Sequence, residues 1–336
     1  MTVTAAGTGT GEKRRAAEIV VTGSLAYDYI MNYSGDLRDH IMPDKVHVLS
    51  ISILVQKLNK QRGGTAGNMA YTLALLGQPC TVLATAGAED FETYRAYLVG
   101  LGVDTGGITL LPDDLTASYF AFTDMQNNTV GGFYEGAMRR SDRTTFRDFA
   151  PDSVRVALVG PTVPEGIARF PRECRELGIP FVYNPAWQTA VMGAADLADG
   201  LTGAAVFLGS DYEVATVAEK TGLSEDDMLA RLAPDGALVK TLGGEGSHIR
   251  TRDAEYHIPV APAKAVVDPT GGGDAYTAGL LVGLQRGWGW ERTGRVAALA
   301  ATYTIEQYGP QAHTFTADEF AARYEDAFGS VPGAES

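Results

Sequence analysis

Cysteine is scarce in this chain, which has only Cys80 and Cys174 among its 336 residues. The two lie in unrelated contexts and form no Cys-x-x-Cys pair, so we expect neither a disulfide framework nor a structural zinc site. Histidines with metal-ligand spacing are also lacking. We interpret the five histidines as ordinary surface or loop residues: His40, His47, His248, His257 and His313.

Positive charge is in short supply as well, with 27 Lys and Arg against 41 Asp and Glu and a net charge of −14. This balance disfavours binding to nucleic acid or to an anionic membrane surface. No apolar run reaches the length of a membrane span. Residues 1–17 lack the hydrophobic core of a signal peptide, and their Gly, Thr and Ala content predicts a disordered tail. We therefore expect a cytoplasmic protein with small-molecule partners.

From residue 18 onward, short apolar runs alternate with helical patterns. This order predicts an α/β fold, a doubly wound and mostly parallel sheet with helices on both faces. No low-complexity linker interrupts the pattern, so one domain is expected over residues 18–330. The predicted strands include 19–22, 80–84, 154–159, 181–183, 204–208 and 237–241, and the predicted helices include 66–76, 165–177 and 224–232.

Two segments, about 28–57 and about 116–134, break this rhythm because they alternate polar and apolar residues without a helical period. Such alternation is typical of β-strands with one solvated face. We interpret the two segments as a small β lid over the substrate.

A glycine-rich stretch, Asp268-Pro-Thr-Gly-Gly-Gly-Asp274, precedes a long apolar helical run. Val266 and Val267 before it are interpreted as the end of a strand. Glycines at the start of a helix expose backbone N–H groups that bind phosphate. The adjacent Asp274 can accept a proton from an alcohol, although a first-turn Asp can also simply stabilise its helix. Together the anion nest and the carboxylate predict phosphoryl transfer to a hydroxyl group.

This stretch resembles the C-terminal motif of the ribokinase-like (PfkB) carbohydrate and nucleoside kinases. A second motif of that family is matched upstream by the run from Gly63 and Gly64 through Asn68 to Gly77. The resemblance covers nearly the whole chain and, among the subfamilies, is strongest to bacterial adenosine kinases. It implies a ribokinase-like fold, ATP and Mg²⁺ as cofactors, and a lid that often supplies a dimer interface, so a homodimer through the lid is expected.

The resemblance assigns Asp274 as the catalytic base that takes the proton from the attacking hydroxyl. Gly271, Gly272 and Gly273 would present amides to the developing negative charge. The alternative is that the glycines and Asp274 only begin a helix.

On the acceptor side, Asp28 looks like the aspartate that binds two neighbouring sugar hydroxyls, with Gly63, Gly64 and Asn68 also contacting the sugar. The remaining matches concern the nucleobase of the acceptor. The aromatic rings of Tyr119 and Phe133 would stack on it, although lid aromatics also serve simple packing. Polar contacts near the nucleoside are expected from Ser24, Ser52 and Gln188. Trp187 and Val191 stand where the subfamily has Gln and Arg, which weakens the argument for strict adenosine specificity.

On the ATP side, the loop containing Thr241, Gly243 and Gly246 matches a Thr-x-Gly-x-x-Gly motif that faces phosphate and ribose. Ser210 and Glu213 occupy the family's Asn-x-x-Glu site, and Glu213 would organise Mg²⁺ through water. By the same resemblance, Asp268 with backbone carbonyls near Tyr308 is a candidate for a monovalent cation such as K⁺.

These matches predict an ATP-dependent nucleoside kinase, with adenosine kinase as the first hypothesis and a ribose 5′-hydroxyl as the acceptor. The alternatives are a broad-specificity kinase for inosine, guanosine or cytidine, a ribokinase-type sugar kinase, and a nucleotide-binding homologue without turnover.

Overall fold

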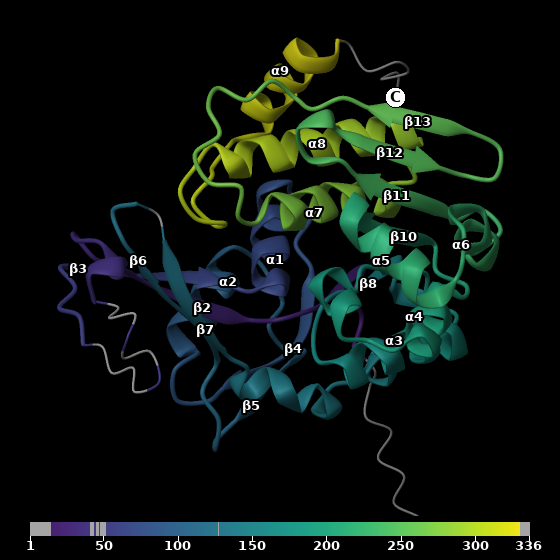
Figure 1. Cartoon of the computed structure of the whole chain (residues 1–336). Coiled ribbons are helices and arrows are strands. Elements are labelled where there is room, and N and C mark those ends of the chain that lie inside the picture. Colours follow the sequence, from purple (N-terminus) through teal and green to yellow (C-terminus); the bar gives the residue numbers. More distant parts are fainter. Residues whose placement is uncertain (1–14, 41–43, 45–46, 48–51, 127, 330–336) are drawn as a thin grey trace, which may run out of the picture.

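The computed structural model describes residues 15–40, 44, 47, 52–126 and 128–329 (Figure 1). Most of the predicted disordered tail therefore lies outside the described residues. Its last residues are held by hydrogen bonds: the Arg15 amide donates to the carbonyl of Asp148 at 2.8 Å, and the Ala17 amide donates to the Ser153 hydroxyl at 3.1 Å.

A nine-stranded sheet forms the centre of the molecule, in the order β13-β12-β11-β10-β9-β8-β1-β4-β5. All strand pairs from β11 to β5 are parallel, and β12 and β13 add an antiparallel hairpin at one edge. The strands are β1 Ile19–Thr22, β4 Thr81–Gly87, β5 Ile108–Leu111, β8 Val156–Val159, β9 Phe181–Tyr183, β10 Val206–Ser210, β11 Ala237–Thr241, β12 Ser247–Arg250 and β13 Glu255–Ile258.

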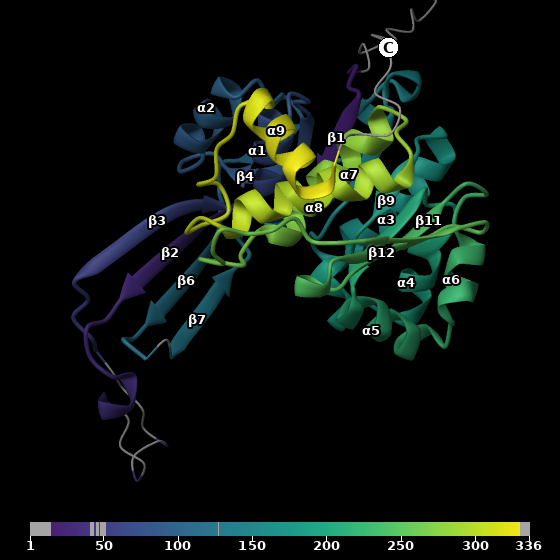
Figure 2. The same ribbon diagram turned by 90° about the horizontal axis from the view of Figure 1, so that it is seen from above.

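Helices cover both faces of this sheet (Figures 1 and 2). Successive strand residues point to opposite faces, so Val21 belongs to one core cluster and Val20 to the other. The Val21 face is covered by α1 Thr65–Leu75, α2 Glu92–Gly100, α7 Gly272–Gln285 and α8 Trp290–Ile305. The Val20 face is covered by α3 Pro164–Leu177, α4 Ala194–Leu201, α5 Asp211–Thr221 and α6 Glu225–Arg231, while α9 Ala317–Phe328 packs on α8. This architecture confirms the predicted doubly wound α/β fold.

A second, four-stranded sheet projects from the main body (Figure 2). Its order is β3-β2-β6-β7, with β2 Ala26–Asn32, β3 Lys57–Gly63, β6 Ala117–Thr123 and β7 Thr129–Tyr134. Three of these strands fall in or next to the predicted lid segments. Strand β3 lies almost wholly beyond the first predicted lid segment, which ends at about residue 57. The sequence shows no sign of this strand, because five of its side chains are polar and its strand propensity is low. It forms by pairing with β2.

Most predicted elements are present within two residues of their expected ends. The prediction of a strand end at Val266 and Val267 is wrong: these residues lie in an irregular segment and are 67% and 54% exposed. The segment is held by the amide of Val267, which donates to the Ile305 carbonyl at 2.8 Å. Among the described residues, no helix is both long and apolar enough to span a membrane.

Candidate active site

The glycine-rich stretch reaches its helix through a left-handed turn at Gly271, which has φ +82° and is the N-cap of α7. A Cβ there would lie 2.5 Å from the Cβ of Pro310, so both the conformation and the space favour glycine. The Gly272 amide is used locally, donating to the Pro269 carbonyl at 3.2 Å. Gly273 is exposed and faces open space at the helix N-terminus, where first-turn amides lack intrahelical partners. An anion can therefore approach the start of α7.

Asp274 lies in the first turn of α7 and points toward α1, where Asn68 donates to its Oδ2 at 2.8 Å. Burial of the carboxylate raises the pKa of Asp274 to about 7, and the Asn68 hydrogen bond opposes part of that shift. A carboxylate with a pKa near neutrality is well matched to general-base catalysis. This geometry supports the predicted role of Asp274.

The pH dependence of turnover tests that role, because only the carboxylate form of Asp274 can accept a proton. We expect kcat/KM to fall about tenfold per pH unit below about pH 7 and to level off above it. Initial rates between about pH 5.5 and 9 give the profile; rates that stay flat down to about pH 5.5 would contradict the role of Asp274.

A hydrogen-bond network that the sequence did not reveal continues from this carboxylate. The amide nitrogen of Gln311 donates to Asn68 Oδ1 at 3.0 Å and to the Tyr94 hydroxyl at 2.5 Å. Tyr94 in turn donates to the Gly63 carbonyl at 3.0 Å. Gln311 fixes the amide orientation of Asn68, so the Asn68 nitrogen faces Asp274. Neither Gln311 nor Tyr94 lies in a glycine-rich motif, and no local pattern marks them.

Asp28 lies on β2 of the small sheet, opposite Gln61 of β3 and Tyr119 of β6. Gly63 packs directly against the carboxylate, and a Cβ at that position would overlap it. Burial raises the pKa of Asp28 to about 6, with a further contribution from the negative charge of Asp268. The Gly63 carbonyl belongs to the network that ends at Asp274, so the two carboxylates are joined through a short chain of contacts.

The two aromatic residues predicted to stack on the nucleobase lie on the same sheet face as Asp28. Tyr119 pairs with Asp28 across β2 and β6, and Phe133 pairs with Tyr119 across β6 and β7. Directly opposed residues in a sheet point to the same side. Tyr119 is half-buried and Phe133 is 45% exposed, so the rings are not committed to the core. The face therefore presents a carboxylate next to an aromatic platform.

The other predicted acceptor-side residues have different surroundings. Ser24 is buried, and its hydroxyl accepts a hydrogen bond at 3.0 Å from the amide of Thr65, the first residue of α1. Ser52 is exposed in an irregular segment that precedes β3. The role of both serines stays a prediction.

Gln188 lies in a short 3-10 helix, Ala186–Ala190, that begins with a strained residue, Ala186, at φ +47°. Its side chain is only 2% exposed, and its amide nitrogen donates to the Thr162 carbonyl. By contrast, Trp187 and Val191 are 48% and 65% exposed. In this arrangement the Gln188 amide is turned into the protein, and its contact with a base stays a prediction.

The predicted ATP-side residues meet at the carboxyl ends of two neighbouring parallel strands. Ser210 ends β10 and is in register with Thr241, which ends β11. The loop that follows includes Gly243 and Gly246, and at Gly243 a Cβ would meet open space. Ligands in doubly wound folds bind at this edge of the sheet. The arrangement supports the predicted position of a phosphate-binding loop.

Ser210 and Glu213 form a capping box at the start of α5. The Ser210 hydroxyl accepts from the Glu213 amide at 3.2 Å, and Glu213 Oε2 accepts from the Ser210 amide at 2.7 Å. A Ser-x-x-Glu spacing is a known signal for this motif. One Glu213 oxygen and the Ser210 O–H remain for other partners. This donor set suits Mg²⁺, which prefers few carboxylates and keeps several waters.

Asp268, in the loop before α7, accepts hydrogen bonds from two backbone amides. Its Oδ1 accepts from Thr270 at 2.9 Å, and its Oδ2 accepts from Gly309 at 3.0 Å. The bond from Gly309 ties the glycine-rich stretch to the segment after α8, which also carries Gln311. A monovalent cation at Asp268 stays a prediction.

Known proteins resemble this chain over nearly its whole length. The model of the pfkB family of carbohydrate kinases matches residues 16–317. The nucleoside kinase of Methanothermobacter thermautotrophicus is 29% identical over 318 residues, covering 94% of this chain and 98% of that protein.

Solved structures give the same relationship. The Burkholderia thailandensis nucleoside kinase in complex with inosine has a TM-score of 0.83 and 35% identity, covering 94% of this chain and all of that one. The Methanocaldococcus jannaschii nucleoside kinase, an archaeal member of the ribokinase family, has a TM-score of 0.81 and 26% identity over 93% of this chain and 99% of that one.

The chain belongs to the pfkB family of carbohydrate kinases. It is a phosphotransferase with a hydroxyl group as acceptor.

Proposed function

We propose that this protein is an ATP-dependent nucleoside kinase that phosphorylates the ribose 5′-hydroxyl. The observation that carries the proposal is the contact chain from Asp274 through Asn68, Gln311 and Tyr94 to Gly63, which ends against the Asp28 carboxylate. This chain of contacts connects Asp274, a carboxylate with a pKa of about 7 at an anion-binding helix N-terminus, to Asp28, a carboxylate suited to binding two sugar hydroxyls.

The aromatic platform favours a nucleoside over a free sugar as acceptor. Tyr119 and Phe133 lie on the same sheet face as Asp28, so a base could stack there while the ribose hydroxyls reach the carboxylate. A bare sugar needs no such platform.

We further propose that the base specificity extends beyond adenosine. Gln188 donates to a main-chain carbonyl instead of facing outward, and Trp187 is exposed beside it. A base held mainly by stacking is selected weakly, because every base offers a flat face. The similar Burkholderia thailandensis enzyme has been solved with inosine, which fits a pocket that does not require the adenine amino group.

In the proposed reaction, Asp28 and Asn68 hold the ribose so that its 5′-hydroxyl lies near Asp274. Asp274 then accepts the hydroxyl proton as the oxygen forms its bond to the γ-phosphorus and the bond to ADP breaks. The free amides at the start of α7 stabilise the added negative charge. The small sheet shields the acceptor from water, which would otherwise compete for the phosphoryl group.

Mg²⁺ would be held near Glu213 through water and would neutralise phosphate charge when bound. The ATP phosphates would lie between the Thr241–Gly246 loop and the start of α7. A monovalent cation would bind beside Asp268, whose carboxylate accepts a hydrogen bond from the Gly309 amide.

A homodimer through the small sheet is also proposed. The sheet face opposite Asp28 exposes several large apolar side chains, a pattern that marks interaction surfaces. These are Leu58, Phe120, Val130 and Tyr134, at 58%, 42%, 64% and 40% exposed.

An acceptor panel tests the proposed specificity. Release of ADP from Mg-ATP would be measured with adenosine, inosine, guanosine, cytidine and ribose at equal concentrations. We expect adenosine and inosine to react at comparable rates and ribose to react far more slowly. Turnover of adenosine alone would restore the adenosine-kinase hypothesis, and a dominant ribose rate would contradict a nucleoside acceptor.

A further inference from the structure

The antiparallel hairpin β12–β13 places three metal-ligating side chains on one sheet face. His248 of β12 lies directly opposite His257 of β13, and Glu255 precedes His257 by two residues on the same strand. Residues two apart on a strand share a face, so all three side chains point the same way. One ligand atom from each lies within 4.8 Å of the others. The nine-residue separation of the two histidines gives no sequence signal, because only the hairpin register brings them together.

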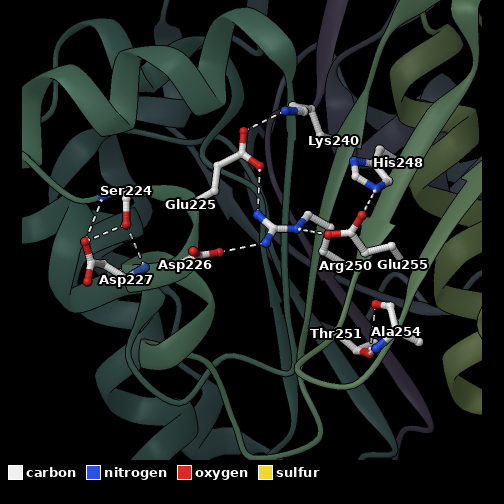
Figure 3. Close-up of polar contacts among 10 residues, drawn as sticks. All are labelled: Ser224, Glu225, Asp226, Asp227, Lys240, His248, Arg250, Thr251, Ala254 and Glu255. Atoms are coloured by element: carbon white, nitrogen blue, oxygen red, sulfur yellow. Dashed lines mark hydrogen bonds and ion pairs between the residues drawn. The ribbon is translucent and has the colours of Figure 1, made fainter.

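The cations beside this cluster are already paired with carboxylates: Lys240 with Glu225, and Arg250 with Glu225, Asp226 and Glu255. Arg250 donates to Glu255 Oε1 at 2.9 Å, which leaves Oε2 facing His248 Nε2 at 3.5 Å (Figure 3). Within the described part of the chain, His248 Nε2 has no hydrogen-bond partner although it is shielded from solvent. An imidazole nitrogen without a hydrogen-bond partner is available to bind a metal ion.

Two imidazoles and one carboxylate are a donor set that suits Zn²⁺, with water as a fourth ligand. The two rings are stacked, with centroids 4.3 Å apart and planes 8° apart. Parallel rings cannot both direct a nitrogen at one ion, whose ligand atoms stand roughly 3.4 Å apart in tetrahedral geometry. One ring must turn. His257 can do so, because it is exposed and β13 is the outermost strand of the sheet.

We propose that His248, Glu255 and His257 form a Zn²⁺-binding site that clips the β12–β13 hairpin. The site is separate from the proposed catalytic centre but close to it in sequence, because β12 begins at the residue after Gly246. A bound ion would stabilise the hairpin that supports the Thr241–Gly246 loop.

Zinc titration of the full-length protein without nucleotide or Mg²⁺ tests the proposal. Isothermal calorimetry with ZnCl₂ is expected to give one site, and Co²⁺ in its place is expected to show the visible absorption of a tetrahedral ion. His257→Ala changes an exposed side chain and should weaken zinc binding at least about tenfold, since even outer-shell changes cost 10–100-fold. Glu255→Gln should weaken it as well. Thermal unfolding should shift upward with zinc in the wild type and much less in either variant.

His40→Ala is the matched control, because His40 is also exposed but lies far along the chain beside Tyr33. It should bind zinc like the wild type. The zinc-free His257→Ala protein should keep wild-type kinase activity, which shows that the variant is folded. Absence of zinc binding by the wild type, or equal binding by wild type and His257→Ala, would overturn the proposal.

Discussion

Replacing Asp274 by asparagine is expected to lower kcat about 10²–10⁴-fold while leaving ATP binding largely intact, because removal of a general base has effects of this size. Asparagine keeps the shape of the side chain and can still accept the hydrogen bond from Asn68. It cannot take a proton from the acceptor hydroxyl. Steady-state rates and ATP affinity measured on both proteins check this. Asp318→Asn, at a first-turn aspartate of α9, is the matched control and should be silent.

The stability of the Asp274→Asn variant distinguishes a catalytic role of Asp274 from a role in capping helix α7. The folded-state pKa of Asp274 is about 7, above its ordinary value of 3.8. The folded protein therefore binds more protons than the unfolded chain between these values, so this group's contribution to stability is present below about pH 4 and is lost as the pH rises through about 7. At pH above about 7, Asp274→Asn should unfold at a higher denaturant concentration than the wild type. Near-normal turnover combined with lower stability would show that Asp274 serves the helix instead.

Replacing Asp28 by asparagine is expected to raise the KM for the nucleoside about 10–100-fold, since hydrogen bonds to a charged group contribute about 1.5–3 kcal/mol. The effect on KM for ATP should be small, because Asp28 lies on the small sheet, whereas β10 and β11 belong to the main sheet. Substrate titrations with each partner in excess give both values.

Asp39→Asn is the control for this measurement, because Asp39 is an exposed aspartate on the segment after β2. It should leave both KM values unchanged. An unchanged nucleoside KM in Asp28→Asn would refute the assignment of Asp28 to the sugar.

The sequence predicts the main sheet well because its strands are buried on both sides. Val156–Val159 and Phe181–Tyr183 are apolar throughout, and helical periodicity marks the segments between them. An apolar run does not mark β3, which contains Lys and Gln side chains. These are tolerated because the strand is at the edge of a half-solvated sheet. At Val266 an apolar residue wrongly suggests a strand, because the side chain is exposed and not buried.

The sequence predicts those parts of the candidate site in which the backbone conformation or close packing requires a glycine. Gly271 has a left-handed conformation and Gly63 lies against Asp28, so both positions exclude side chains. Gln311 and Tyr94 cannot be found in this way, because their role depends on contacts between distant elements. The pairing of His248 with His257 likewise depends on the register of two strands.

Product analysis tests the central claim most directly. The full-length protein would be incubated with Mg-ATP and inosine or adenosine, and the products separated and identified by mass and by ³¹P NMR. Acceptors that lack only the 5′-oxygen, the 5′-deoxy forms, serve as matched controls. We predict stoichiometric ADP and nucleoside 5′-monophosphate, with no product from the 5′-deoxy acceptors. Phosphorylation of a 5′-deoxy nucleoside, or transfer to a free sugar but to no nucleoside, would contradict a nucleoside 5′-kinase.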